Sequence, residues 1–198
     1  MEGIVKKYQK KFKMVKDEMN RWEELQCRLI SQFRNSSSII ERLQVIQDSR
    51  NYGGLSSVDG IKDAVLQKQM ESLEIILLSM KKTLQEFNSI ISSLEKIHRD
   101  GRQLVKGGSS KLGVKQLQQR VGIKPCLADC LDGLMLLYIM HQSEYHLKSS
   151  LLSALCAISL KPSASDLGVL QQLLVDQPNI PKDEVQCIFD IIFAEDIC

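Results

Sequence analysis

Apolar side chains recur at alternating steps of three and four residues along residues 4 to 47. Ten of the thirteen positions in this first stripe are apolar: Val5, Tyr8, Phe12, Val15, Met19, Trp22, Gln26, Leu29, Phe33, Ser36, Ile40, Leu43 and Gln47. Residues at this spacing lie on one side of a helix, so the pattern predicts one long helix that packs against another. The polar members Gln26, Ser36 and Gln47 interrupt the stripe, and such residues usually cost stability while they fix register or partner.

A second stripe of the same spacing follows the turn-forming segment 48 to 60, which contains Gly53 and Gly54. Nine of its ten positions are apolar: Leu66, Met70, Leu73, Leu77, Met80, Leu84, Phe87, Ile91, Leu94 and His98. Two such helices, about 4–47 and 61–99, should fold back as an antiparallel coiled-coil-like hairpin. A second apolar flank, formed by Ile75, Ile76, Leu78 and Ile90, exceeds what a hairpin can cover. This flank predicts that further helices, from this chain or another, pack there.

The rest of the chain is punctuated differently, because five glycines fall in residues 100–125 and all four prolines lie from Pro125 onward. We expect 100–125 to be a flexible basic linker with a short helical stretch near 113–120. Helices are predicted from Pro125 to about Leu160, from Asp166 to Val175 and from Lys182 to about Glu195. The prediction is therefore an all-α chain with a hairpin over 1–99, a linker over 100–125 and a C-terminal helical unit over 126–198.

The large apolar residues of these helices are the candidate interface residues, within the bundle or toward a partner. They are Trp22, Phe33, Leu43, Leu77, Leu84, Phe87, Leu131, Leu134 and Tyr138. Trp22 is the only tryptophan, and two interpretations stay open for it. It either fills the contact between helices of this chain or anchors a contact with another chain.

Charge and apolar run length limit the classes of function. The formal net charge of +2 does not favour nucleic-acid binding as the main task. Basic residues are nevertheless concentrated in two stretches: lysines cluster in 6–13, and 99–124 contains seven basic residues and one acid. These two stretches predict a solvated face or linker, with nuclear import or contact with an anionic surface as the alternative. No signal peptide is visible, and the longest apolar run, residues 134–140, is too short to span a bilayer. We expect a soluble cytoplasmic and nuclear protein with reduced cysteines.

Catalytic and metal-binding patterns are weak. Cys126 and Cys130 share a helical face with His141 or His146 nearby, but a structural zinc site normally shows closer pairs and four clear ligands. We interpret these two, with Cys27, Cys156 and Cys187, as small core residues. The glycine pairs form no phosphate-binding loop, and no serine or cysteine sits in a strand–turn–helix elbow. The sequence thus predicts no catalytic residue, cofactor or metal.

The order of several segments resembles the AIRIM family and, more distantly, its CINP paralogues. The segments are 10–22 (KKFKMVKDEMNRW), 39–50 (IIERLQVIQDSR), 66–77 (LQKQMESLEIIL), 126–134 (CLADCLDGL), 165–173 (SDLGVLQQL) and 180–186 (IPKDEVQ). The resemblance implies a non-catalytic adaptor that joins a CINP-like helical subunit on AAA+ ATPases of the AFG/SPATA type. Such assemblies act in late maturation of the large ribosomal subunit, and they are also linked to protein turnover at the replication machinery.

Several alternatives stay open beside the adaptor. A generic coiled-coil scaffold subunit would show the same stripes, and a CINP-like binding protein of the cell cycle or DNA replication would share the resemblance. An RNA-binding helical protein would use the basic stretches, and an unrecognised enzyme would need a polar pocket.

Overall fold

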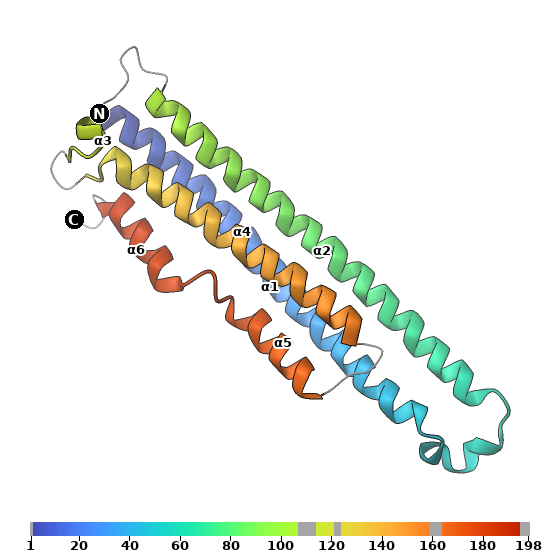
Figure 1. Cartoon of the computed structure of the whole chain (residues 1–198). Coiled ribbons are helices and arrows are strands. Elements are labelled where there is room, and N and C mark those ends of the chain that lie inside the picture. The colour runs from blue at the N-terminus through green and yellow to red at the C-terminus, as the bar shows by residue number, and fades with distance from the viewer. Residues whose placement is uncertain (1, 107–113, 121–123, 159–163, 195–198) are drawn as a thin grey trace. The chain divides into compact units, whose positions relative to one another are not determined.

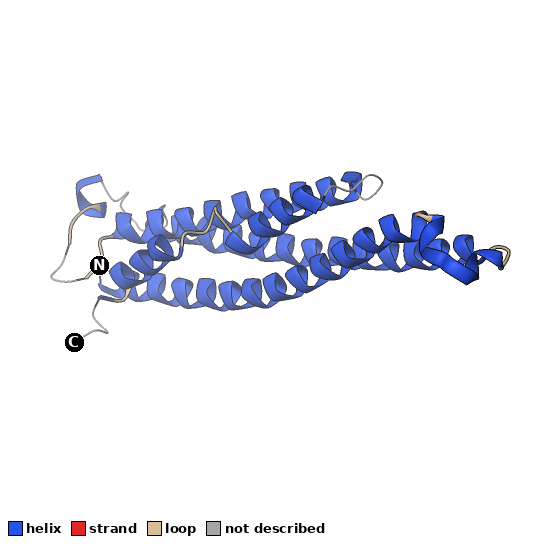
Figure 2. Cartoon of the chain, turned by 90° about the horizontal axis from the view of Figure 1, so that it is seen from below, coloured by secondary structure: helices blue, strands red, loops and turns tan. Residues whose placement is uncertain are grey.

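The computed structural model of the chain describes residues 2–106, 114–120, 124–158 and 164–194 (Figure 1). Within these residues every regular element is a helix, which confirms the all-α prediction (Figure 2). The elements are α1 (Glu2–Gln47), the 3-10 helix η1 (Ser49–Ser57), α2 (Ile61–Lys106), α3 (Val114–Leu117), α4 (Leu127–Ile158), α5 (Ala164–Asp176) and α6 (Lys182–Ile192).

The helix boundaries follow the sequence patterns except in two places. The turn-forming segment after α1 is largely a 3-10 helix, where the sequence indicates only turns. The helix α2 continues to Lys106, through the first part of the segment predicted as a linker. The short helix predicted near 113–120 is present as α3, whereas the linker residues 107–113 and 121–123 lie outside the described residues.

The chain divides into two compact units that do not follow its order. Unit 1 comprises Met1–Glu24, Phe87–His146 and Gln177–Cys198, and unit 2 comprises Leu25–Glu86 and Leu147–Asp176. The helices α1, α2 and α4 therefore contribute one part to each unit, and α6 and α5 complete units 1 and 2 respectively. The division into a hairpin, a linker and a C-terminal unit as separate folding entities stays a prediction.

In unit 1 the first half of α1 packs antiparallel to the last turns of α2. The Tyr8 hydroxyl donates a 2.7 Å hydrogen bond to the carbonyl oxygen of Gly101, and the Ser93 hydroxyl donates one of 2.7 Å to Glu18. A Cβ at Gly101 would lie 2.8 Å from Leu134 Cδ1, so α4 approaches α2 closely at this glycine. Burial raises the pKa of Tyr8 above its usual range, so its hydroxyl keeps the proton that it donates.

The approach of α4 to α1 and α6 in unit 1 depends on a second glycine. A Cβ at Gly133 would lie 3.0 Å from Phe12 Cζ of α1 and 3.0 Å from Ile188 Cγ2 of α6. The rings of Phe12 and Phe189 meet edge to face, with centroids 5.9 Å apart. The absence of a side chain at Gly133 thus lets three helices meet around Phe12.

In unit 2 the second half of α1 packs antiparallel to the first half of α2. Gln32 donates to the Ser79 hydroxyl at 2.8 Å and accepts from the Thr83 hydroxyl at 3.1 Å. Arg28 and Glu86 form an exposed ion pair of 2.7 Å. Surface pairs of this kind add little stability, so the apolar core of unit 2 is the larger contribution.

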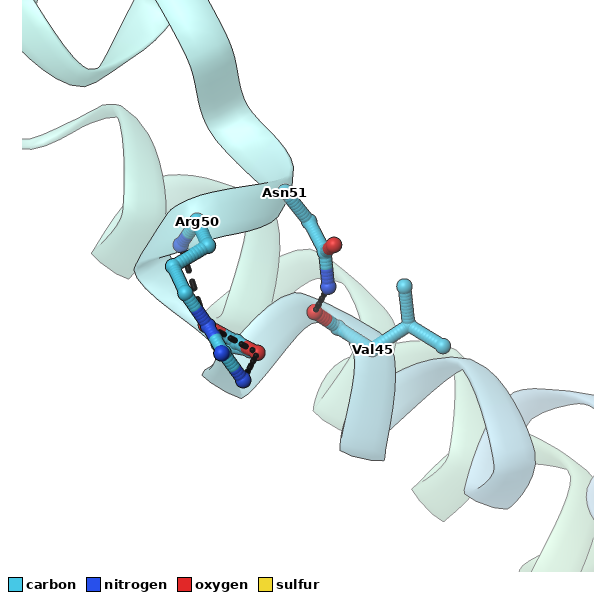
Figure 3. A network of polar contacts seen from close by, with 4 residues as sticks. Val45, Arg50 and Asn51 are labelled. Atoms are coloured by element: carbon cyan, nitrogen blue, oxygen red, sulfur yellow. Dashed lines mark hydrogen bonds and ion pairs between the residues drawn. The ribbon is translucent and has the colours of Figure 1, made fainter.

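The end of α1 is closed by side chains of η1, as Figure 3 shows. The Asn51 side-chain amide donates a 2.7 Å hydrogen bond to the carbonyl oxygen of Val45 in the last turn of α1, which also accepts a 3.3 Å bond from the Asp48 N–H. Arg50 forms a 2.7 Å ion pair with Asp48. Gly53 and Gly60 adopt φ values of 49° and 75°, which residues with a Cβ rarely adopt.

Candidate protein-interaction surfaces

The structure places most of the nine predicted interface residues inside the two units. Of these, six are buried: Trp22, Phe33, Leu43, Leu84, Phe87 and Leu134. The other three, Leu77, Leu131 and Tyr138, are half-buried. The six buried side chains are covered within this chain, whereas Leu77, Leu131 and Tyr138 keep part of their surface exposed.

Trp22 lies in the core of unit 1 and is 1% exposed. Its indole ring meets Phe87 of α2 and His141 of α4 edge to face, with centroids 4.5 and 4.9 Å away. Its Nε1 donates a 2.8 Å hydrogen bond to Oε1 of Gln177. The tryptophan therefore fills a contact among helices of its own chain and satisfies its one polar atom there.

Two buried polar contacts position the segment between α5 and α6. Gln177, with φ of 47°, accepts the bond from Trp22. Two residues later, the backbone N–H and the side-chain amide of Asn179 both donate to Oε2 of the fully buried Glu144, at 3.2 and 3.1 Å. These directional bonds fix where α6 begins, since an apolar contact alone would permit several positions.

The polar interruption Gln26 has a corresponding role in unit 2. Its Nε2 donates to the carbonyl oxygen of Leu174 in α5 at 2.6 Å, and its Oε1 accepts from Lys148 Nζ of α4 at 2.7 Å. Gln26 and Lys148 are 3% and 1% exposed. One amide thus joins three helices, which agrees with the expectation that a polar residue in an apolar stripe fixes the partner.

The helix α4 carries apolar residues on all sides, and some of these residues are exposed to solvent. Leu134 and Leu137 are buried in unit 1, whereas Met135, Leu136 and Ile139 are 38%, 42% and 44% exposed. Positions three and four residues apart share a helix face, so Ile139 adjoins both Met135 and Leu136. These three residues, the α4 patch, lie in the longest apolar run of the sequence. The length of this run could have identified the three residues from the sequence, but it does not indicate which side of the helix is buried.

Unit 2 exposes further apolar residues on two helices. Ile75 and Leu78 of α2, three residues apart, are 67% and 50% exposed, in agreement with the spare flank predicted from the sequence. Ile90, the fourth member of that flank, is instead buried in unit 1. On α5, Val169 and Leu173 are 60% and 37% exposed. A helix that is apolar on its outer face is typical of a surface that another protein covers.

A groove of about 560 Å³ opens between α1 and α6 in unit 1. Its apolar lining includes Phe12, Met19, Val185, Phe189 and Phe193. Lys13, Lys16, Glu23 and Asp190 also line it, so charges of both signs border the apolar surface.

Cys126 and Cys130, the cysteines considered as metal ligands, serve in helix capping and in packing. Cys126 Sγ accepts from the Asp129 N–H at 3.3 Å, and the Asp129 carboxylate accepts from the Cys126 N–H at 3.0 Å. This reciprocal pair at the start of α4 is a capping box with cysteine in the place of serine. Burial raises the pKa of Cys130 to about 12, with a further contribution from the Asp129 charge. A thiol that stays protonated is a poor nucleophile and a poor metal ligand.

The interpretation of the remaining cysteines as core residues is wrong for two of them. Cys27 and Cys187 are exposed, and Cys156 is partly exposed. An apolar neighbourhood in sequence did not fix which side of the helix these residues occupy. Across the described residues, no group of three or more His, Cys, Asp or Glu side chains could hold a metal ion.

Comparison with known proteins identifies the family. None of the helices in the described ranges is long and apolar enough to cross a membrane. The comparison with curated proteins found no match to the chain. A protein-family match does cover residues 2–197, nearly the whole chain, and its description is "CA109-like: Ribosome biogenesis protein C1orf109-like". The predicted resemblance to the AIRIM family is thereby confirmed, and the chain belongs to this family of ribosome biogenesis proteins.

Proposed function

We propose that this chain is a non-catalytic adaptor subunit of a AAA+ ATPase complex of the AFG/SPATA type, acting in late maturation of the large ribosomal subunit. In this proposal ATP hydrolysis belongs to the ATPase, and the chain contributes binding surfaces. Its place of action is the cytoplasm and the nucleus, where preribosomal particles are handled. A role in protein turnover at the replication machinery is a second setting for the same adaptor.

The observation that carries the proposal is the α4 patch. Met135, Leu136 and Ile139 are large apolar side chains in water on a helix whose other sides are already packed. Covering them removes apolar surface from water at about 25 cal/mol per Å², which favours a partner with its own apolar face. The family match supplies the biological setting, since it is described by ribosome biogenesis.

The partner that suits this surface is a helical subunit of the CINP-like kind. The paired stripes of α1 and α2 support a coiled-coil-like hairpin as the frame of the adaptor, with α4 laid along it. A second amphipathic helix can pack on the α4 patch in the same ridge-into-groove manner as the helices within the chain. The exposed α2 and α5 residues of unit 2 then remain for the ATPase.

The test compares full-length chains carrying an affinity tag, recovered from native extract. Leu136→Glu together with Ile139→Glu places two carboxylates on the α4 patch. The matched control is Ser31→Glu with Asn35→Glu, which adds the same charge at two exposed positions of α1. We expect the wild type and the control to recover a AAA+ ATPase and a CINP-like subunit, identified by mass spectrometry. The α4 variant should lose at least one of them about tenfold or more.

Circular dichroism and thermal melting verify that both variants keep the helical fold. Recovery of no AAA+ ATPase by the wild type would overturn the adaptor role. If the α4 variant recovers both partners as the control does, the patch is the wrong surface. A generic coiled-coil scaffold predicts instead a self-assembled oligomer without ATPase, which light scattering on the purified chain would reveal.

A further inference from the structure

A second groove, distinct from the α4 patch, lies in unit 1 beside the last turns of α2. It has a volume of about 580 Å³, and its lining includes His98, Arg99, Arg102 and Lys106 of α2 together with Tyr138 of α4. The three cations are spaced by three and four residues, so they share one face of α2. All three are exposed.

The charge of this groove is largely uncompensated. In the part of the chain that the structure describes, Glu95 is the one acid that lines it. The nearby Asp100 carboxylate is engaged elsewhere, in a 3.6 Å ion pair with Lys11 of α1. Arg99, Arg102 and Lys106 form no ion pair with any other residue that the structure describes. Three cations beside one acid attract an anion locally, even though the net charge of the chain is only +2.

Two aromatic rings adjoin the cations. His98 and Tyr138 lie nearly parallel, with an interplanar angle of 14° and centroids 6.2 Å apart, and both are partly exposed. The Tyr138 hydroxyl accepts a 2.8 Å hydrogen bond from Gln142, which restricts its ring. Burial, and then the positive charge of Arg102, lower the pKa of His98 although Glu95 opposes this, so the imidazole is neutral at pH 7. It therefore supplies a flat face and no charge.

We propose that this groove, between Arg99, Arg102 and Lys106 of α2 and Tyr138 of α4, binds single-stranded RNA. The cations hold the phosphate backbone, and the aromatic faces stack an adjacent base. Cations in a row beside aromatic rings are the combination with which proteins bind single strands without reading their sequence. The bases of a duplex are already stacked and have no free face for Tyr138. This inference is independent of the adaptor proposal, because no residue of the α4 patch lines the groove and the ligand is of a different class.

An acidic protein segment is the competing ligand, and the rings favour RNA over it. Carboxylates would use Arg99, Arg102 and Lys106 but would gain nothing from a flat aromatic face. Removing the ring while keeping the cations therefore separates the two ligands.

The experiment measures fluorescence anisotropy of a labelled twelve-nucleotide oligouridine RNA with the full-length chain, between 50 and 200 mM KCl. Three variants accompany the wild type: Arg99→Gln with Arg102→Gln and Lys106→Gln, the single change Tyr138→Leu, and a charge-matched control. The control, Lys7→Gln with Lys10→Gln and Lys82→Gln, removes the same charge at exposed positions that do not line this groove. Circular dichroism establishes that each variant is folded.

Three phosphate contacts predict a slope of about −2 for log affinity against log salt concentration with a single strand. The groove variant should bind at least tenfold more weakly at 50 mM KCl and lose most of this slope. Tyr138→Leu should weaken binding about fivefold or more and keep the slope, while the control binds as the wild type does.

No RNA binding by the wild type at 50 mM KCl would overturn the proposal. So would a control that loses as much affinity as the groove variant, since binding would then follow net charge alone. A labelled polyglutamate peptide bound as tightly as the RNA, with Tyr138→Leu without effect on either, would assign the groove to an acidic protein instead.

Discussion

Trp22 and Gln177, which are 155 positions apart in the chain, share a buried 2.8 Å hydrogen bond from the indole nitrogen to the side-chain oxygen. Gln177 makes this contact from a backbone with φ of 47°, a conformation unfavourable for most residues with a Cβ. A rare backbone conformation is therefore held by a specific side-chain contact, and the start of the segment leading to α6 depends on one aromatic residue in α1.

The change Trp22→Phe should lower the free energy of unfolding by about 1–3 kcal/mol, because it leaves the Gln177 oxygen without its donor in the core. Urea unfolding followed by circular dichroism measures the loss. Gln177→Asn serves as the partner change, since asparagine tolerates positive φ but is too short to reach the indole. A double variant whose loss equals the sum of the two single losses would show that the bond does not couple these residues.

Replacing Gln26 with an apolar residue should lower the free energy of unfolding, although the neighbouring positions of the stripe are apolar. Gln26→Leu leaves Lys148 and the Leu174 carbonyl without one buried partner each, so we expect a loss of about 2–4 kcal/mol. Lys148→Met alone should also destabilise the chain. The combined variant should lose less than the sum of both, because it replaces the buried polar contact with apolar packing. A strictly additive result would contradict a direct contact.

Two of the helical glycines, Gly133 of α4 and Gly168 of α5, should respond differently to alanine. A Cβ at Gly168 meets no atom within 4 Å, so Gly168→Ala should raise the free energy of unfolding by about 0.5–1 kcal/mol through helix propensity. Gly133→Ala should lack this gain, because its Cβ would lie 3.0 Å from Phe12 and from Ile188. Gly133→Val should cost about 1–3 kcal/mol. Thermal melting of the three variants checks the order, and equal stabilisation by both alanines would refute the close approach of α4.

Leu84 and Leu77 belong to the same predicted stripe but differ in burial. Leu84 is 9% exposed, whereas Leu77 is half-buried. Leu84→Asp should therefore cost about 3 kcal/mol or more, since a buried carboxylate has no partner there, and Leu77→Asp should cost about 1 kcal/mol. Denaturant unfolding of the single variants measures both. A larger loss of stability from Leu77→Asp than from Leu84→Asp would mean that the assignment of the buried face of α2 in unit 2 is wrong.

The capping box at the start of α4 predicts a pH dependence. Burial would raise the pKa of Asp129, but the hydrogen bonds from Cys126 and then the Arg120 charge outweigh it, so the pKa is lowered from 3.8. A lowered pKa means that the ionised group stabilises the fold above its unfolded pKa and that this stability is lost as pH falls through the folded pKa.

Asp129→Asn should therefore reduce stability by about 0.5–1 kcal/mol at neutral pH, and the difference from the wild type should shrink toward zero below pH ~3.8. Unfolding curves of both proteins between pH 3 and 8 measure this difference. Asp132→Asn, at an exposed position of the same helix, controls for general charge effects. A difference that persists unchanged at pH 3 would contradict the role of the carboxylate.

Much of α1 was predictable because its regularly spaced apolar stripe lies on the buried side of the helix, and the exposed Met14 and Val45 fall outside that stripe. Of the thirteen stripe positions, all but Met19 and Gln47 are buried. The stripe of α2 predicted burial less well, since Leu66, Met70 and Leu77 stay partly or largely exposed in unit 2. Periodicity identifies the side of a helix that prefers to be covered, but it does not reveal how much of that side finds a neighbour.

The rest could not be predicted for three physical reasons. The helix α4 is apolar all round, so no period distinguishes its buried Leu134 from its exposed Leu136. The extension of α2 past Gly101 was missed because a glycine indicates a break by propensity, whereas here it permits close approach to Leu134. The contacts of Gln26 with Lys148 and of Trp22 with Gln177 join distant segments, and a polar residue in a stripe does not name its partner.

The α4 patch also has a consequence for the steady-state abundance of this protein in a cell. Under the adaptor proposal, a copy made in excess of its partner leaves Met135, Leu136 and Ile139 exposed to solvent. Exposed apolar surface of this kind is recognised by chaperones and proteases. The steady-state amount of the chain would then follow the supply of the subunit that covers α4. Loss of that subunit would deplete the chain after translation, with its messenger RNA unchanged.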